Sequence, residues 1–213
     1  MADRASGTVA ADFRVTVGGL PEPPPPELDP YLDAAVRCFV RYGVGRTSVQ
    51  DVAAEMKVNR TTVYRQVGNV EAMLRLVNAR ALNRIVVRAL DRAGRSRVTP
   101  GSVASLLAEL IEMVRADPVV RKVLADEIHL VGTILEDLPA IIDRVVVSVT
   151  PPMEAAMAGG ILARRDARIV AGWMTRIAAT CIVAPPPGDL GRFLAEVVVP
   201  LLAPSGPAGD GPR

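Results

Sequence analysis

The spacing of apolar residues follows the helical period along nearly the whole chain, and this feature limits the fold more than any other. Apolar side chains recur every three to four positions, as in an amphipathic helix, and no sustained segment alternates with the period of two that a half-buried strand shows. Aromatic residues make up only 3% of the 213 residues, so Ala, Val and Leu must build the interior. The sequence therefore predicts an all-α fold.

Composition divides the chain into four parts. Residues 1–27 end in PEPPPPE, which favours extended backbone, and we expect a disordered proline-rich arm there. Residues 204–213 are too poor in apolar groups to pack, and we expect a disordered tail. Between them we expect one domain over 28–75 and a second, helical domain over 76–203. Residues 28–97 hold 13 Lys/Arg against 6 Asp/Glu, which suggests a head that binds a polyanion, although a solvated basic face would carry the same charge.

Capping residues and helix breakers predict where the helices begin and end. We expect helices over about 29–42, 48–56, 59–66, 69–92, 100–116, 118–125, 137–158, 166–184 and 189–203. Pro151 and Pro152 fall inside the seventh of these, and their rings clash with the preceding helical turn. We therefore expect that helix to be strained or broken at the two prolines.

The residue types that support catalysis are scarce. Cys38 and Cys181 lie in predicted helices and read as small core residues in a reducing compartment, and His129 is the only histidine. With no glycine-rich phosphate loop and no metal-binding spacing, we expect no enzyme, no cofactor and no metal site. No stretch approaches the roughly 18 apolar residues of a membrane span, and charged residues occupy the N-terminus where a signal peptide is apolar. We expect a cytoplasmic protein without a membrane partner.

Residues 47–67 have the pattern of a helix-turn-helix. Ser48 and Asn59 are good N-caps for two short helices separated by a tight turn. Val63 and Val67 can pack inward against the first helix, which turns the polar and basic positions of the second helix outward. This is the geometry in which a recognition helix enters a DNA major groove, although both caps could be caps and nothing more.

The stretch 31–80 resembles the DNA-binding domain of the tetracycline-repressor (TetR) family, in Thr47-Ser48-Val49, in Val52-Ala53 with Val58, and in Val63-Tyr64-Arg65. The resemblance implies an N-terminal three-helix DNA-binding domain followed by a helical ligand-binding and dimerisation domain. It implies a transcriptional regulator that binds double-stranded DNA. The expected regulator is a repressor that binds a pseudo-palindromic operator as a homodimer and is released by a hydrophobic small molecule. The alternative is a ligand-independent helical dimer that acts as a DNA-architectural or protein-adaptor module.

The resemblance also assigns roles to residues of the motif. Thr47 and the Ser48 amide would hold a backbone phosphate at a helix N-terminus, Arg60 would face base edges, and Tyr64 would grip phosphates. The alternatives are an ordinary exposed Arg60 and a half-buried Tyr64 that only packs. The complete predicted DNA-binding set is Arg46, Thr47, Ser48, Lys57, Asn59, Arg60, Thr61, Thr62, Tyr64 and Arg65.

Two positions depart from the family pattern. Val67 stands where the family usually has an aromatic residue, and Val70 stands where a lysine is common at the start of the fourth helix. The second change removes one phosphate contact, for which Arg46 or Lys57 could compensate.

The resemblance further implies an inducer pocket inside the helical body. Apolar, adaptable side chains with two polar neighbours are the candidates: Met113, Glu127, His129, Met153, Met157, Trp173 and Met174. Methionines at helical spacing are more often core residues than ligand contacts, so both interpretations stay open. Because no cluster of Arg, Asn or Gln accompanies these positions, a hydrophobic ligand of modest polarity fits them best.

The last two predicted helices carry apolar stripes and small residues that suit a two-fold helical interface. They also resemble the paired C-terminal helices through which TetR-family proteins dimerise. The predicted interface consists of Ala171, Ala178, Phe193, Leu194, Val197, Val198 and Leu201. The alternative is that the core of the same chain covers both stripes.

Overall fold

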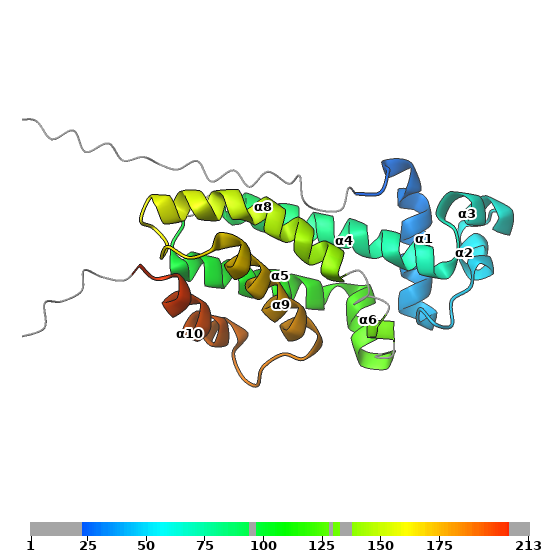
Figure 1. Cartoon of the computed structure of the whole chain (residues 1–213). Helices are drawn as coiled ribbons and strands as arrows, with labels where there is room; N and C mark the ends of the chain where they lie inside the picture. Colours follow the sequence, from blue (N-terminus) through cyan, green and yellow to red (C-terminus); the bar gives the residue numbers. More distant parts are fainter. Residues whose placement is uncertain (1–22, 94–96, 128–129, 133–137, 205–213) are drawn as a thin grey trace, which may run out of the picture.

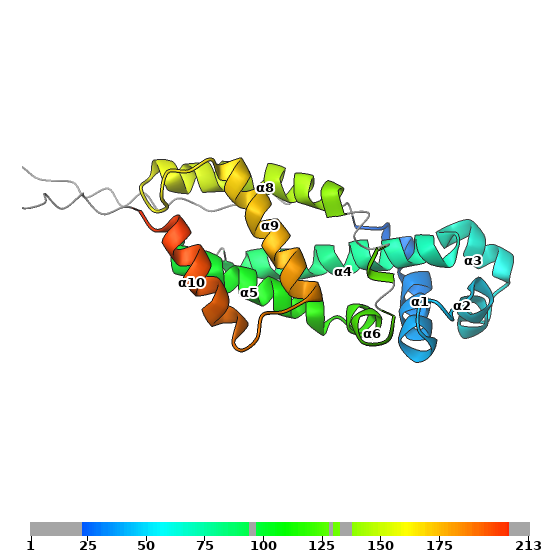
Figure 2. The ribbon, with the colours of Figure 1, turned by 60° about the horizontal axis from the view of Figure 1, so that its bottom comes forward.

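The computed structural model describes residues 23–93, 97–127, 130–132 and 138–204, and all regular structure in these ranges is helical, as predicted. A short 3-10 helix, η1 (Pro26–Leu28), precedes α1 (Asp29–Tyr42), α2 (Val49–Met56), α3 (Arg60–Val67), α4 (Val70–Ala93), α5 (Pro100–Ala116), α6 (Pro118–Asp126), α8 (Leu138–Ala158), α9 (Ala167–Val183) and α10 (Leu190–Leu202). The molecule is elongated, with α1–α3 at one end, α8–α10 toward the other, and α4 running lengthwise between them (Figures 1 and 2).

Side-chain caps begin the helices close to the predicted positions. Asp117 accepts the Val119 N–H at the start of α6, Asp166 accepts the Ile169 N–H at the start of α9, and Asn69 accepts the Ala72 N–H at the start of α4. Each cap satisfies an N–H that has no partner within its helix. These local signals explain why the predicted helix starts are confirmed.

The expected break in α8 is wrong, because the helix continues without interruption from Leu138 through Pro151 and Pro152 to Ala158. Pro151 and Pro152 supply no N–H to the carbonyls of Val147 and Ser148, so two hydrogen bonds of the helix are missing. Val147 is exposed and Ser148 is half-buried. The helix nevertheless continues past both prolines.

Two hydrophobic cores hold the molecule together. The first core contains Phe39 of α1, Val52 of α2 and Val63 of α3, and we call these helices with the start of α4 the head. The second contains side chains of α5, α8, α9 and α10, which we call the body. Val119 and Val123 of α6 are buried in the first core, so α6 packs against the head although it follows α5 of the body in sequence.

Arg80 of α4 ties that helix to the head. Its guanidinium lies 2.7 Å from Asp29 Oδ1 and 2.8 Å from Asp33 Oδ1, and the arginine side chain is almost completely buried. Hydrogen bonding from Arg80 is the main cause that lowers the pKa of the Asp29 carboxyl below its usual range. The buried guanidinium is thus held by two carboxylates on the first turns of α1.

The lowered pKa of Asp29 predicts a loss of stability in acid. A depressed folded-state pKa gives stability that is present above the unfolded value, about 3.9, and disappears as pH falls through the folded value. Thermal unfolding of the wild type followed from pH 6 to pH 2 should show this loss, and Asp29→Asn should lose less than the wild type over the same range. Parallel curves for the two proteins would contradict the role given to Asp29.

Both cysteines are buried and free, and burial raises the pKa of each thiol, as suits core residues. None of the described helices combines the length and hydropathy needed to cross a bilayer.

The end of the predicted arm takes regular structure, since Pro24 is buried and η1 leads into α1. The rest of the arm through residue 22, His129, and the predicted tail from residue 205 lie outside the described residues.

Candidate nucleic-acid interface

Local hydrogen bonds shape both the start of α2 and the turn that joins α2 to α3. Ser48 and Asp51 form a capping box at the start of α2, in which the Ser48 N–H donates to Asp51 Oδ2 at 2.8 Å. A hydrogen bond from the Ser48 hydroxyl at 2.6 Å, together with the one from the Ser48 N–H, lowers the pKa of the Asp51 carboxyl. At the end of α2, Lys57 takes a left-handed conformation with φ +57° and its N–H donates to the Ala53 carbonyl. The two helices are therefore joined by a tight turn.

α3 presents one apolar face to the head and a polar face to solvent. Asn59 caps it by accepting the Thr61 N–H at 2.9 Å. Val63 and Val67 are buried in the head core, whereas the Tyr64 side chain is 59% exposed. The described surface also exposes Arg60, Thr61 and Arg65, and Thr62 is half-buried. The predicted orientation of the helix is confirmed.

The exposed surface around α3 is positively charged because the nearby carboxylates already have partners. Glu55 of α2 accepts hydrogen bonds from Arg37 at 2.7 Å and Arg41 at 3.3 Å, and the bond from Arg37 lowers its pKa. Within the described part of the chain, no carboxylate pairs with Arg60 or Arg65. α3 itself contains no acidic residue.

Thr47 and Ser48 make contacts other than the predicted phosphate contacts. The Thr47 side chain is only 7% exposed and its hydroxyl donates to the Gly43 carbonyl at 2.6 Å. The Ser48 N–H donates to Asp51, whose carboxylate would repel a phosphate. In this conformation neither group is available to hold a phosphate, and their observed roles are to shape the loop and to cap α2.

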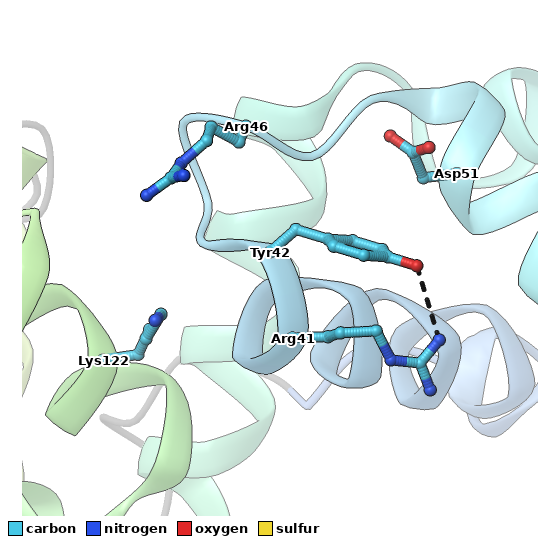
Figure 3. Close-up of a pocket in the computed structure, with 5 residues that line it drawn as sticks. All are labelled: Arg41, Tyr42, Arg46, Asp51 and Lys122. Atoms are coloured by element: carbon cyan, nitrogen blue, oxygen red, sulfur yellow. Dashed lines mark hydrogen bonds between the residues drawn. The ribbon is translucent and has the colours of Figure 1, made fainter.

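Arg46 lies on the loop between α1 and α2. It lines an open hollow with Arg41, Tyr42, Asp51 and Lys122. Figure 3 shows its side chain directed away from Asp51, toward the side of the hollow where Lys122 of α6 projects. Arg46 thus extends the basic surface from the head toward α6.

Glu127 is not part of a pocket in the body, which corrects its predicted place. It follows α6 and its carboxylate accepts the Val44 N–H at 2.6 Å and the Gly45 N–H at 2.8 Å. Met153, Met157 and Met174 are buried in the body core, Trp173 packs against that core, and Met113 is half-buried. Of the two interpretations left open by the sequence, the one in which the methionines are core residues matches their position in this structure.

The structure also corrects part of the predicted dimer interface. Ala171, Leu194 and Val198 are buried inside the body, because α9 packs on α8 and α10 packs on α5. Phe193 and Val197 remain 40% and 39% exposed, and Ala178 and Leu201 are half-buried. The same chain therefore covers one side of α10 and leaves the other in solvent.

Residues 32–77 match the sequence family described as "Bacterial regulatory proteins, tetR family". This segment is a TetR-family DNA-binding domain. A chain that carries it is a DNA-binding transcriptional regulator, which accords with the expectation that it is not an enzyme. No curated protein sequence matches the chain.

Solved structures of transcriptional regulators share the fold. A TetR-family regulator from Pectobacterium atrosepticum has a TM-score of 0.62 and 19% identity, covering 80% of this chain and 86% of that one. The repressor AlkX from Dietzia sp. strain DQ12-45-1b has a TM-score of 0.60 and 20% identity, covering 84% and 96%. FadR from Bacillus subtilis, in complex with stearoyl-CoA, has a TM-score of 0.55 and 16% identity, covering 81% and 97%.

The ion pairs between α1 and α2 were not predicted from the sequence. Arg37 and Arg41 are four residues apart and therefore share one face of α1, opposite Glu55 of α2. Their spacing was a usable signal, because it places two cations where one carboxylate of the neighbouring helix can reach both. In this TetR-family head, the pairing links α2 to α1 and neutralises Glu55.

Proposed function

We propose that the chain is a repressor that binds a pseudo-palindromic operator as a homodimer and is released by a hydrophobic small molecule. The observation that carries the DNA-binding part is α3, whose buried Val63 and Val67 hold an exposed surface containing Arg60, Tyr64 and Arg65. Arginine suits guanine O6 and N7 in the major groove, and Tyr64 with Arg65 suits phosphates. Lys57, Asn59, Thr61 and Thr62 complete the proposed contact surface.

The dimer is proposed to form through the exposed side of α10, with α9 beside it. Phe193, Val197 and Leu201 follow one another at intervals of four residues and so lie along one face of the helix. A two-fold axis through such a face would present two copies of α3 to successive major grooves, about 34–36 Å apart. The two-fold symmetry is why the operator is proposed to be pseudo-palindromic, and the spacing sets the distance between its half-sites.

The inducer is proposed to enter the body near its buried methionines. Methionine side chains adapt to irregular ligands, and FadR from Bacillus subtilis, which shares this fold, binds stearoyl-CoA. Stearoyl-CoA and free stearic acid are therefore two suitable first probes. Release of bound DNA by either probe would support the proposal, and binding of a probe without release of DNA would reject that probe as an inducer.

Two substitutions in α3 are expected to separate affinity from sequence choice. Tyr64→Ala should weaken binding to all DNA sequences, because it removes a phosphate contact, whereas Arg60→Ala should cost about 1–3 kcal/mol mainly on the preferred sequence. The measurement is fluorescence anisotropy with a duplex selected from random DNA and with a scrambled duplex, over a range of salt concentrations. Wild-type affinity should fall steeply with salt.

Gln66→Ala is the matched control, because Gln66 is exposed at the last turn of α3 and carries no charge. It should bind both duplexes nearly as the wild type does. Equal losses from Arg60→Ala on the selected and scrambled duplexes would contradict a base-reading role. Salt-independent binding with no selected sequence would instead favour the adaptor alternative.

A further inference from the structure

Glu127 forms a contact between α6 and the head that spans more than eighty residues of sequence. Its Oε2 accepts the Val44 N–H at 2.6 Å and its Oε1 accepts the Gly45 N–H at 2.8 Å, and the residue is only 7% exposed. Within the described part of the chain, no Lys or Arg forms an ion pair with this carboxylate. The two backbone N–H groups are therefore its observed partners, and a buried carboxylate depends on such bonds.

The loop between α1 and α2 is shaped around that carboxylate. Gly43 has φ +90°, and a Cβ at this position would lie 3.1 Å from the carboxylate atoms of Glu127. A Cβ at Gly45 would lie 3.0 Å from Oε1. Any side chain at either position would push the carboxylate away, so the Gly43-Val44-Gly45 sequence lets the backbone approach Glu127 closely. Successive N–H groups of this kind form a natural anion-binding concavity.

The same loop sets where α2 begins. The Thr47 hydroxyl donates to the Gly43 carbonyl at 2.6 Å, and the Thr47 N–H donates to the Val44 carbonyl at 3.1 Å. Thr47 leads directly into Ser48, the N-cap of α2. A displacement of Val44 or Gly45 would therefore be passed to the first turn of the helix-turn-helix.

We propose that Glu127 is a positioning residue that fixes the orientation of α2 and α3 relative to α6, and that operator affinity depends on this contact. We call it the Glu127 clamp: the Glu127 carboxylate with the N–H groups of Val44 and Gly45. The apolar contacts of Val119 and Val123 attach α6 to the head but are not directional, whereas two hydrogen bonds to one carboxylate fix a position. The proposal rests on the DNA-binding function proposed above.

Glu127→Gln is the first test, since it keeps the shape of the side chain. A Gln can accept only one of the two N–H groups and must direct its own NH2 at the other. Affinity for the selected duplex should fall about tenfold or more, at a temperature where both proteins are folded. Glu154→Gln is the charge-matched control, because Glu154 is exposed on α8. Removing a negative charge favours DNA binding in general, so a loss confined to Glu127→Gln cannot come from charge.

A distance measurement tests the clamp without DNA. Spin labels on introduced cysteines at the exposed positions Gln66 of α3 and Glu112 of α5 report the position of the head relative to the body, and the native cysteines are buried. The distance distribution should be narrow in the wild type and broader in Glu127→Gln. An unchanged distribution, or unchanged affinity for the selected duplex, would overturn the proposal. Failure of the wild type to bind any duplex would reject the proposed function, while a broadened distribution would still establish that Glu127 positions the head.

Gly45→Ala tests the Glu127 clamp by changing the loop instead of the carboxylate. Its Cβ should displace the carboxylate and lower the urea midpoint of the wild type, and it should cause little further change in Glu127→Ala, where no carboxylate remains. Gly101→Ala is the control, since its nearest contact would be the Thr99 hydroxyl at 3.8 Å, and it should act equally in both backgrounds. Additive effects of Gly45→Ala and Glu127→Ala would overturn the proposal.

Discussion

Replacing both Phe193 and Val197 by Asp is expected to separate the proposed dimer into folded monomers. Both side chains are about two-fifths exposed on α10, so a carboxylate at either position stays in water in the monomer. In a dimer the same carboxylates would lose their hydration inside an apolar contact, and each would occur twice by symmetry. Full burial of such a side chain is worth about 1.5–3 kcal/mol, so the two-fifths still exposed can contribute about 0.6–1.2 kcal/mol each. With four such side chains in a dimer, the dissociation constant should rise about 100-fold or more.

Sedimentation of the double variant should give monomer at concentrations where the wild type is dimeric, with an unchanged helical circular dichroism spectrum. Val40→Asp is the control: Val40 is 42% exposed on α1, at the opposite end of the molecule from α10 (Figure 1). It introduces one carboxylate of the same kind and should leave the dimer intact. Dimerisation of the double variant with wild-type affinity would reject α10 as the interface.

The contrast between Phe193 and Leu194 shows what the sequence could and could not predict about this surface. Both residues belong to one apolar stripe, and periodicity correctly assigns them to a helix. A stripe does not record whether the same chain or a second copy covers it. α5 covers Leu194 and Val198 within the chain, so those two residues were wrongly included in the predicted interface.

Local signals were the reliable part of the prediction. Ser48, Asn59 and Asp166 cap helices with the residues that directly follow them, so their roles can be recognised within a few positions. The contact of Glu127 with Val44 and Gly45 joins residues more than eighty positions apart, and one sequence gives no direct record of such a pair. In the sequence, Gly43-Val44-Gly45 indicates the stop of the helix predicted over 29–42, although two glycines so close together also indicate a close approach of another group.

Phe39→Ala is expected to cause the largest loss of stability in the head. Phe39 is completely buried in the core that holds α1, α2, α3 and α6 together. Truncation of a buried Phe to Ala removes apolar contacts and leaves a cavity, at a cost of about 3–5 kcal/mol. Because a typical domain is stable by only about 5–15 kcal/mol, the variant should lose a large part of its resistance to urea.

Val40→Ala is the matched control, because Val40 is the next residue of α1 and faces solvent. Its effect should stay within about 0.5 kcal/mol. Urea unfolding followed by far-ultraviolet circular dichroism compares both variants with the wild type. The Phe39→Ala variant should also lose affinity for the selected duplex as its head unfolds, since the buried side of α3 belongs to the same core. Equal urea midpoints for the two variants would contradict the packing of α3 and α6 around Phe39.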